Sequence, residues 1–249
     1  PMRSAEKKVP PRKGQNRADP RRPSMESTFM RKLAGSALKM YYLLAGFLGF
    51  LLCGVWFGVQ LGLNAVFFKA GRGRLAYFSP LMASCVPIAL ILRRSGSYSL
   101  NLSALSDAGL WGLSAATLLL TCLIKILSER NRRRAEKRQL AYMCMETAFV
   151  EIAQRLMMQS FVMNLLAAWG CGAAWCVPLN ALVWCAGICA QASLLKQPLT
   201  KALAADLLAS FVFSIGCGYV FYRSGCIVFS MAAHAAERLI TAKIVSSDS

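Results

Sequence analysis

Apolar residues occur in seven long blocks, which short polar or basic segments separate. The blocks cover residues 41–68, 75–92, 109–127, 140–168, 171–195, 203–222 and 226–245. A helix that crosses a bilayer needs about 20 mostly apolar residues, and a helix satisfies its own backbone hydrogen bonds inside lipid. The pattern therefore predicts an all-α fold, a polytopic membrane helix bundle with about seven transmembrane helices.

The composition points to the same class. Of the 249 residues, 56% are hydrophobic and 16% are charged, and the mean hydropathy is +0.46. Such a chain has more apolar surface than one soluble core of this size can bury. We expect an integral protein of an endomembrane or organelle membrane, with the lipid bilayer as its main partner and other membrane proteins as partners through helix packing.

The net charge of +18 is concentrated outside the apolar blocks. Residues 1–36 are rich in Arg, Lys, Pro and Ser, which is typical of a disordered basic arm. Such an arm can contact anionic lipid headgroups, or it can simply be a solvated tail that sets the topology. Phe29 is the one aromatic residue of the arm, so aromatic residues do not alternate with the basic ones and nucleic-acid binding is not expected.

A second basic run divides the chain into two parts. It lies in the loop 128–139, between N-terminal transmembrane helices (37–127) and a helical core (140–245). Short basic loops face the cytoplasm or its equivalent. In a model with seven spans, this loop lies on the same side as the basic residues near 69–74 and 196–201, whereas the N-terminal arm lies on the other side.

The ten cysteines predict neither a disulfide framework nor a metal site. Most lie inside apolar blocks, where cysteine behaves as a small hydrophobic residue. Cys171 and Cys176 lack the C-x-x-C spacing and a nearby histidine that a zinc site needs. No glycine-rich phosphate loop or dinucleotide fingerprint is present. We therefore predict no metal and no cofactor.

Two polar clusters interrupt the apolar blocks, at residues 150–155 and 234–238. A charged side chain at bilayer depth costs at least about 2.5–3.5 kcal/mol, so each cluster is a functional-site hypothesis. Glu151 and Arg155 are four residues apart on one helix and can neutralise each other. The second cluster contains His234, the only histidine of the chain. Three further polar residues within apolar blocks are predicted to form interhelical hydrogen bonds: Asn164, Asn180 and Asp206.

The sequences around these two polar clusters resemble the motifs of a known protein family. Residues 140–242 resemble the CAAX-protease and bacteriocin-processing family of intramembrane peptidases, also called CPBP or Abi, whose members carry Glu-Glu-x-x-x-Arg, Phe-x-x-x-His and His-x-x-x-Asn on successive helices. The stretch Val150-Glu151-Ile152-Ala153-Gln154-Arg155 is similar to the first motif, and the approach to His234 is similar to the third. The resemblance implies that Glu151, Arg155 and His234 are the catalytic residues, if the chain is active.

The departures from the family pattern are equally specific. Val150 stands where the family has the glutamate that activates water. In the second motif Trp184 replaces the phenylalanine and Ile188 replaces the histidine, and Arg238 replaces the asparagine of the third. Neither Val150 nor Ile188 can accept a proton, so the pattern is that of a degenerate member.

Three classes of function follow. The first and preferred one is a pseudo-enzyme, a multi-pass membrane protein that serves as a non-catalytic scaffold or complex subunit. The second is an active intramembrane endopeptidase on prenylated or hydrophobic peptides. The third is an organelle channel or translocase-like protein. A wide separation of Glu151 from His234 would contradict the two classes derived from peptidases, since water activation needs converging groups.

Overall fold

The computed structural model describes residues 25–95, 101–128, 134–135, 137–194, 196, 198 and 200–244. The chain divides into two units, residues 1–39 and 40–249. The described part of the first unit is the beginning of the long helix α1 (Met25–Lys69). The helix packing and the site described below lie in the second unit.

Every predicted apolar block contains a helix, so the all-helical fold is confirmed. The remaining helices are α2 (Ser79–Ser95), α3 (Ala108–Leu127), α4 (Lys137–Glu151), α5 (Ser160–Ala168), α6 (Cys176–Leu194), α7 (Lys201–Ser224) and α8 (Val228–Thr241). A π-helix, η3 (Ile152–Gln159), joins α4 to α5. Short 3₁₀ turns cover Gly73–Phe78, Leu102–Ser106 and Ala173–Trp175, and two-residue strands β1 (Arg134–Ala135) and β2 (Lys243–Ile244) pair in parallel.

The structure does not confirm seven transmembrane helices. Within the described residues, four helices are long and apolar enough to cross a membrane, and they cover Gly35–Lys69, Ala108–Leu127, Ala173–Leu194 and Lys201–Ser224. In the blocks 75–92 and 226–245, where the sequence predicts spans, the structure has helices of 17 and 14 residues. Both are shorter than a span, which needs about 20 residues. The block at 140–168 is long enough, but it carries the polar residues of the first cluster.

The predicted N-terminal arm also needs a correction. Helix α1 begins at Met25, inside the segment 1–36 that the composition assigns to a disordered arm. Met, Leu, Lys and Ala favour the helix, and these residues continue directly into the apolar block. The rest of the predicted arm, residues 1–24, lies outside the described residues, as does most of the loop 128–139.

Side-chain caps and a glycine set several helix ends. The Asp107 carboxylate accepts hydrogen bonds from the backbone N–H groups of Gly109 and Leu110 at the start of α3. Thr200 accepts one from Leu203 at the start of α7. These contacts satisfy N–H groups that have no partner within the helix. Helix α7 ends at Gly225, whose φ of 66° is in the left-handed region that favours glycine.

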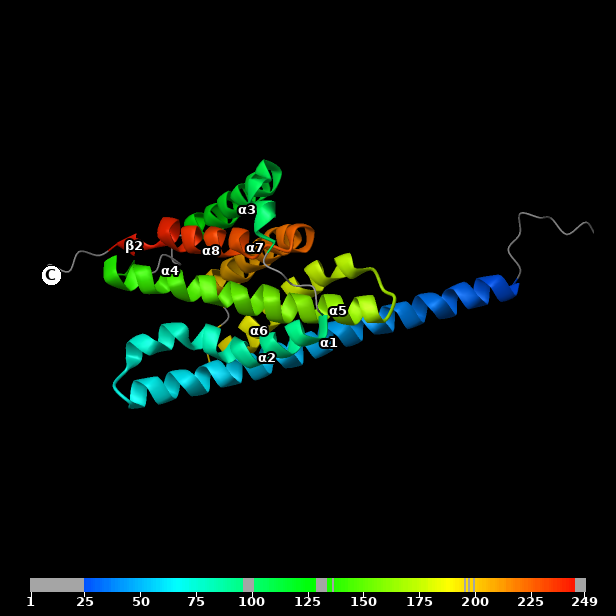
Figure 1. Cartoon of the computed structure of the whole chain (residues 1–249), viewed down its shortest axis with the longest axis horizontal. Helices are drawn as coiled ribbons and strands as arrows, with labels where there is room; N and C mark the ends of the chain where they lie inside the picture. Colours follow the sequence, from blue (N-terminus) through cyan, green and yellow to red (C-terminus); the bar gives the residue numbers. More distant parts are fainter. Residues whose placement is uncertain are drawn as a thin grey trace, which may run out of the picture. The chain divides into compact units, whose positions relative to one another are not determined.

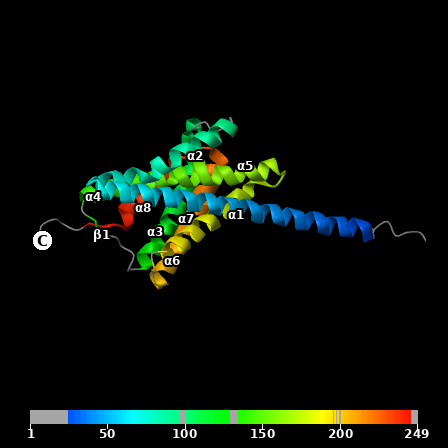
Figure 2. The same ribbon diagram turned by 90° about the horizontal axis from the view of Figure 1, so that it is seen from below.

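Helices α3, α4, α7 and α8 form the centre of the second unit. Helix α8 lies alongside α4 in both views, and α3 contacts both α7 and α8 (Figures 1 and 2). Helix α6 packs on α7. At Gly216 of α7, an added Cβ would collide with the side chain of Thr117 on α3. Small residues at such crossings let membrane helices approach closely.

An aromatic cluster joins α1 to α6. The ring of Trp184 lies 5.8 Å from that of Trp56 and 5.7 Å from that of Phe57. The indole N–H of Trp56 donates to Ser84 Oγ of α2 at 2.9 Å. This cluster includes Val150 and Ile188 among its partly buried members, and it therefore forms one side of the polar interior described next.

Large apolar side chains cover the outside of the candidate spans. Exposed examples include Leu43 and Val55 of α1, Leu119 of α3, Leu182 of α6 and Leu208 of α7. Such a surface fits contact with lipid tails, as the sequence predicts for this class of protein.

Candidate functional site

The two predicted polar clusters meet in the interior. Glu151 lies at the end of α4 and is fully buried, with both carboxylate oxygens engaged. Its Oε2 accepts a hydrogen bond from Arg155 Nε at 3.0 Å, and its Oε1 lies 2.8 Å from His234 Nδ1 of α8. The structure thus confirms that Glu151 and Arg155 pair, and it places Glu151 in contact with His234.

Arg155 extends this network to α7. Its Nη1 donates to Gln159 Oε1 at 3.1 Å and to the backbone carbonyl of Ser214 at 3.3 Å. Gln159 Nε2 in turn donates to the carbonyl of Gly218 at 2.8 Å, and Gln154 Nε2 donates to Ser214 Oγ at 2.6 Å. All these side chains project from η3, and π-helical segments are frequent at functional sites. The network ties η3 to α7 and, through His234, to α8.

The contact with Glu151 selects one tautomer of a neutral His234. A carboxylate is only an acceptor, so the Nδ1 of a neutral His234 carries the hydrogen and donates it to Glu151. The other nitrogen, Nε2, is then an acceptor. The imidazole is partly exposed and lines a cavity of about 400 Å³. His234 can therefore accept a hydrogen bond from a molecule in that cavity.

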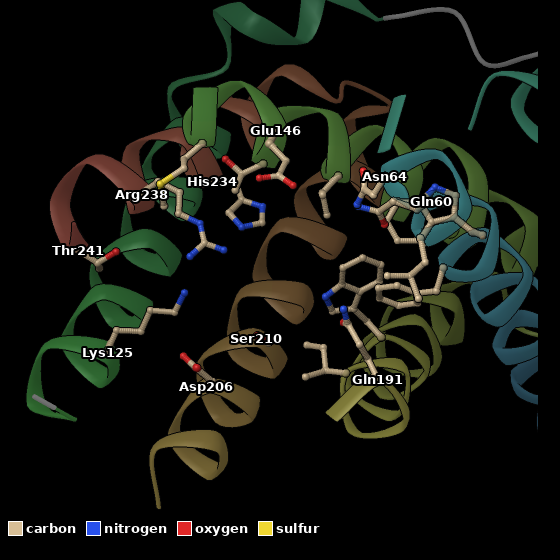
Figure 3. Close-up of a pocket in the computed structure, with 18 of the residues that line it drawn as sticks. Gln60, Asn64, Lys125, Glu146, Gln191, Asp206, Ser210, His234, Arg238 and Thr241 are labelled. Carbon is tan, nitrogen blue, oxygen red and sulfur yellow. The ribbon is translucent and has the colours of Figure 1, made fainter. Parts of the chain in front are cut away.

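The cavity is formed by side chains from six helices (Figure 3). They come from the second half of α1, the end of α3, α4, the second half of α6, the first half of α7 and the end of α8. The described side chains that line it include His234 but not Glu151. Amide side chains lie on one side, and charged side chains lie on the opposite side around Arg238 and Lys125 (Figure 3).

The charged side contains an ion pair that the sequence reasoning missed. Lys125 Nζ of α3 lies 2.8 Å from Glu237 Oε1 of α8, and Arg238 Nε lies 3.7 Å from Glu237 Oε2. Thr241 Oγ1 also donates to Glu237. One signal was available, because Lys125 is the only charged residue of the apolar block 109–127 and an intramembrane charge needs a partner.

The residues that depart from the family pattern lie at this cavity. Val150, Trp184, Ile188 and Arg238 all line it. The sequence comparison therefore identified positions on the cavity wall, although it could not place them together. Glu146, one helical turn before Val150, lines the cavity too, as does His234 (Figure 3).

The other sequence predictions have mixed outcomes. Asn180 of α6 donates to the carbonyl of Gln154 at 3.4 Å, which confirms an interhelical hydrogen bond. Asp206 lines the cavity. All ten cysteines are free. Among the described residues, no group of three His, Cys, Asp or Glu side chains could hold a metal ion.

Comparison with known proteins supports the resemblance. Residues 137–240 match the model of a family described as Rce1-like, type II CAAX prenyl endopeptidase Rce1-like. The match begins at the start of α4 and ends within α8, so it contains Glu151, Arg155 and His234. The chain matches no curated protein and no solved structure.

Proposed function

Since residues 137–240 belong to the Rce1-like family of type II CAAX prenyl endopeptidases, we propose that this membrane protein is a non-catalytic member that acts as a scaffold or as a subunit of a complex. The observation that carries the proposal is the apolar character of two cavity positions. Val150 and Ile188 line the wall, where hydrolysis needs a base and a polarising partner around one water molecule.

The retained glutamate does not replace the missing base. Both oxygens of Glu151 are bound, one to Arg155 and one to His234, and the residue is 0% exposed. To accept a proton from a water in the cavity, Glu151 would have to give up one of these contacts. Glu151, Arg155 and His234 therefore act as a tether between η3 and α8, which is a structural role.

A second candidate function is a peptidase with a relocated base. Glu146 and His234 line the same cavity, and the Nε2 of a neutral His234 whose Nδ1 donates to Glu151 can accept a hydrogen bond. A carboxylate and an imidazole that converge on one water could activate it. In this candidate Glu146 is the base that activates water, a role that the side chain of Val150 cannot fill.

An assay of turnover separates the two candidates. The full chain is reconstituted in liposomes and offered a farnesylated CAAX peptide and a hydrophobic leader peptide, with an active family member assayed in parallel. We expect no cleavage above that of protein-free liposomes. Cleavage that is lost in both Glu146→Gln and His234→Ala, with folded protein retained, would contradict the non-catalytic proposal and establish the second candidate.

The basic segments suggest how the cavity is oriented. The helix ends around the cavity adjoin the connections that carry Lys69, Arg74 and Lys201. Under the positive-inside rule this end faces the cytoplasm or its equivalent. The ten native cysteines, which are all free, are replaced by alanine, and cysteine-reactive labelling of a single cysteine introduced at Lys201, in sealed vesicles of known orientation, tests this assignment. Labelling from the outer side would overturn it.

A further inference from the structure

Two oxygen atoms without a hydrogen-bond partner lie on one wall of the cavity. Gln60 Oε1 and Asn64 Oδ1 are buried, and neither accepts a hydrogen bond from a described residue. Both side chains belong to α1 and line the cavity, and residues four apart on a helix are neighbours. Buried polar groups are normally satisfied, so two adjacent acceptors without a partner point to a ligand that donates hydrogen bonds.

The charged side chains on the opposite side of the cavity balance one another (Figure 3). Glu237 Oε2 and Arg238 Nε also lack a hydrogen bond within the described part of the chain, but they carry opposite charges and lie 3.7 Å apart. Lys125 Nζ lies 2.8 Å from the other oxygen of Glu237. Because both cations already face a carboxylate, this side offers no site for an anion. The unmet requirement of the cavity is a donor at the two amide oxygens.

Carboxylates and aromatic rings favour a donor that carries a positive charge. Glu146 and Asp206 line the same cavity, and a nearby carboxylate offsets the cost of taking a cation out of water. The rings of Trp56, Phe57 and Trp184 also line it, with centroids 4.9–5.8 Å apart. The faces of aromatic rings attract ammonium groups. A cationic N–H donor therefore suits this lining better than a neutral one.

Much of the remaining lining is apolar, so the ligand needs an apolar part as well. Met143, Val150 and Ile188 line the cavity beside the aromatic rings. Leu61 of α1 lines it too, and this side chain is 44% exposed on the apolar outer surface of the helix. The cavity thus borders the surface that faces the lipid tails, and an amphiphilic ligand can reach it from the bilayer.

We infer that the cavity binds a lipophilic primary amine. Its ammonium group has three N–H donors, two of which serve Gln60 Oε1 and Asn64 Oδ1, and its apolar chain packs against Val150 and Ile188. The volume of about 400 Å³ is within the range of small-molecule sites, which suits an organic cation. This inference rests on the proposed function, because a working peptidase would need the same cavity for its peptide.

Four probes with the same hexyl chain test which chemical group the cavity recognises. Thermal unfolding of the full chain in a neutral detergent is followed with hexylamine, trimethylhexylammonium, hexanol or hexanoate added, and affinities are obtained from the shift in melting temperature. We expect hexylamine to bind about tenfold more tightly than trimethylhexylammonium, the effect of one hydrogen bond to a charged group. Hexanol lacks the charge and hexanoate carries the opposite one, so both should also bind more weakly than hexylamine.

Variants of Asn64 assign the preference to the cavity. Asn64→Leu removes one acceptor and should abolish the preference for hexylamine over trimethylhexylammonium. Asn64→Asp keeps an acceptor at the same place and should bind hexylamine at least as tightly as the unchanged chain. Gln60→Leu removes the other acceptor and gives the same readout if Asn64→Leu fails to fold. Asn164→Leu is the matched control, since Asn164 is also half-buried but belongs to α5 and is not part of the described cavity lining.

Three results would overturn the inference. They are the absence of stabilisation by hexylamine, equal affinity for hexylamine and either trimethylhexylammonium or hexanol, and a preference for hexylamine that Asn64→Leu leaves intact while Asn164→Leu behaves in the same way. Failure here without turnover leaves the non-catalytic proposal standing, whereas turnover in the liposome assay contradicts that proposal directly.

Discussion

Glu151→Gln is expected to lower the free energy of unfolding by about 3–5 kcal/mol, because it leaves the buried guanidinium of Arg155 without its anionic partner. Arg155 is 0% exposed, and its Nη2 already lacks a partner among the described residues. The yield of folded protein in detergent and its melting temperature measure the loss. Glu146→Gln is the matched control on the same helix. It is only half-buried and should lose less than about 1 kcal/mol.

A second substitution tests whether the unpaired charge causes that loss. Glu151→Gln combined with Arg155→Leu should recover part of the stability, since a buried pair can often be replaced by apolar groups. Recovery is incomplete because Arg155 also donates to Gln159 and to the Ser214 carbonyl. Full stability in Glu151→Gln alone, or no recovery in the double variant, would refute the tether.

Gly216→Val should separate α3 from α7 and lower the stability by about 3 kcal/mol or more, at the upper end of the range for overpacked cores. A Cβ at residue 216 would overlap the side chain of Thr117. Thr117 is short and β-branched, and its hydroxyl donates to the Leu113 carbonyl at 2.9 Å, so it has little room to turn away.

Gly112→Val provides the matched control for this substitution. Gly112 is also helical, and nothing lies within 4 Å of a Cβ built there. Its variant should keep most of the stability and the folded yield. Equal melting temperatures for the two variants would show that the α3–α7 contact does not limit the stability of the protein.

Several features could be predicted from the sequence because they depend on local pattern. The apolar blocks predict the helices, because each helix must bury at least one apolar face away from water. The spacing of Glu151 and Arg155 predicts their pairing, since residues four apart on a helix are neighbours. The motif order predicts the family relationship that the comparison supports.

Other features depend on where helices end and cross. Helix α8 is too short for the span predicted at 226–245, and helix α1 begins at Met25, inside the segment predicted to be a disordered arm. Both differences arise because helix ends depend on contacts beyond the apolar pattern. The ion pair of Lys125 with Glu237 joins residues 112 positions apart. No spacing rule relates such residues, and only the packing of α3 on α8 brings them together.

The sequence by itself determined the helical membrane class, the chemistry of residues 150–155 and 234–238, and the absence of ionisable side chains at Val150 and Ile188. Only the tertiary structure decided that both oxygens of Glu151 are occupied and that His234 lines the cavity while Glu151 stays behind it. The physical reason is that residue type follows from the sequence, whereas hydrogen-bond partners and access to a cavity follow from how α4, η3, α7 and α8 pack.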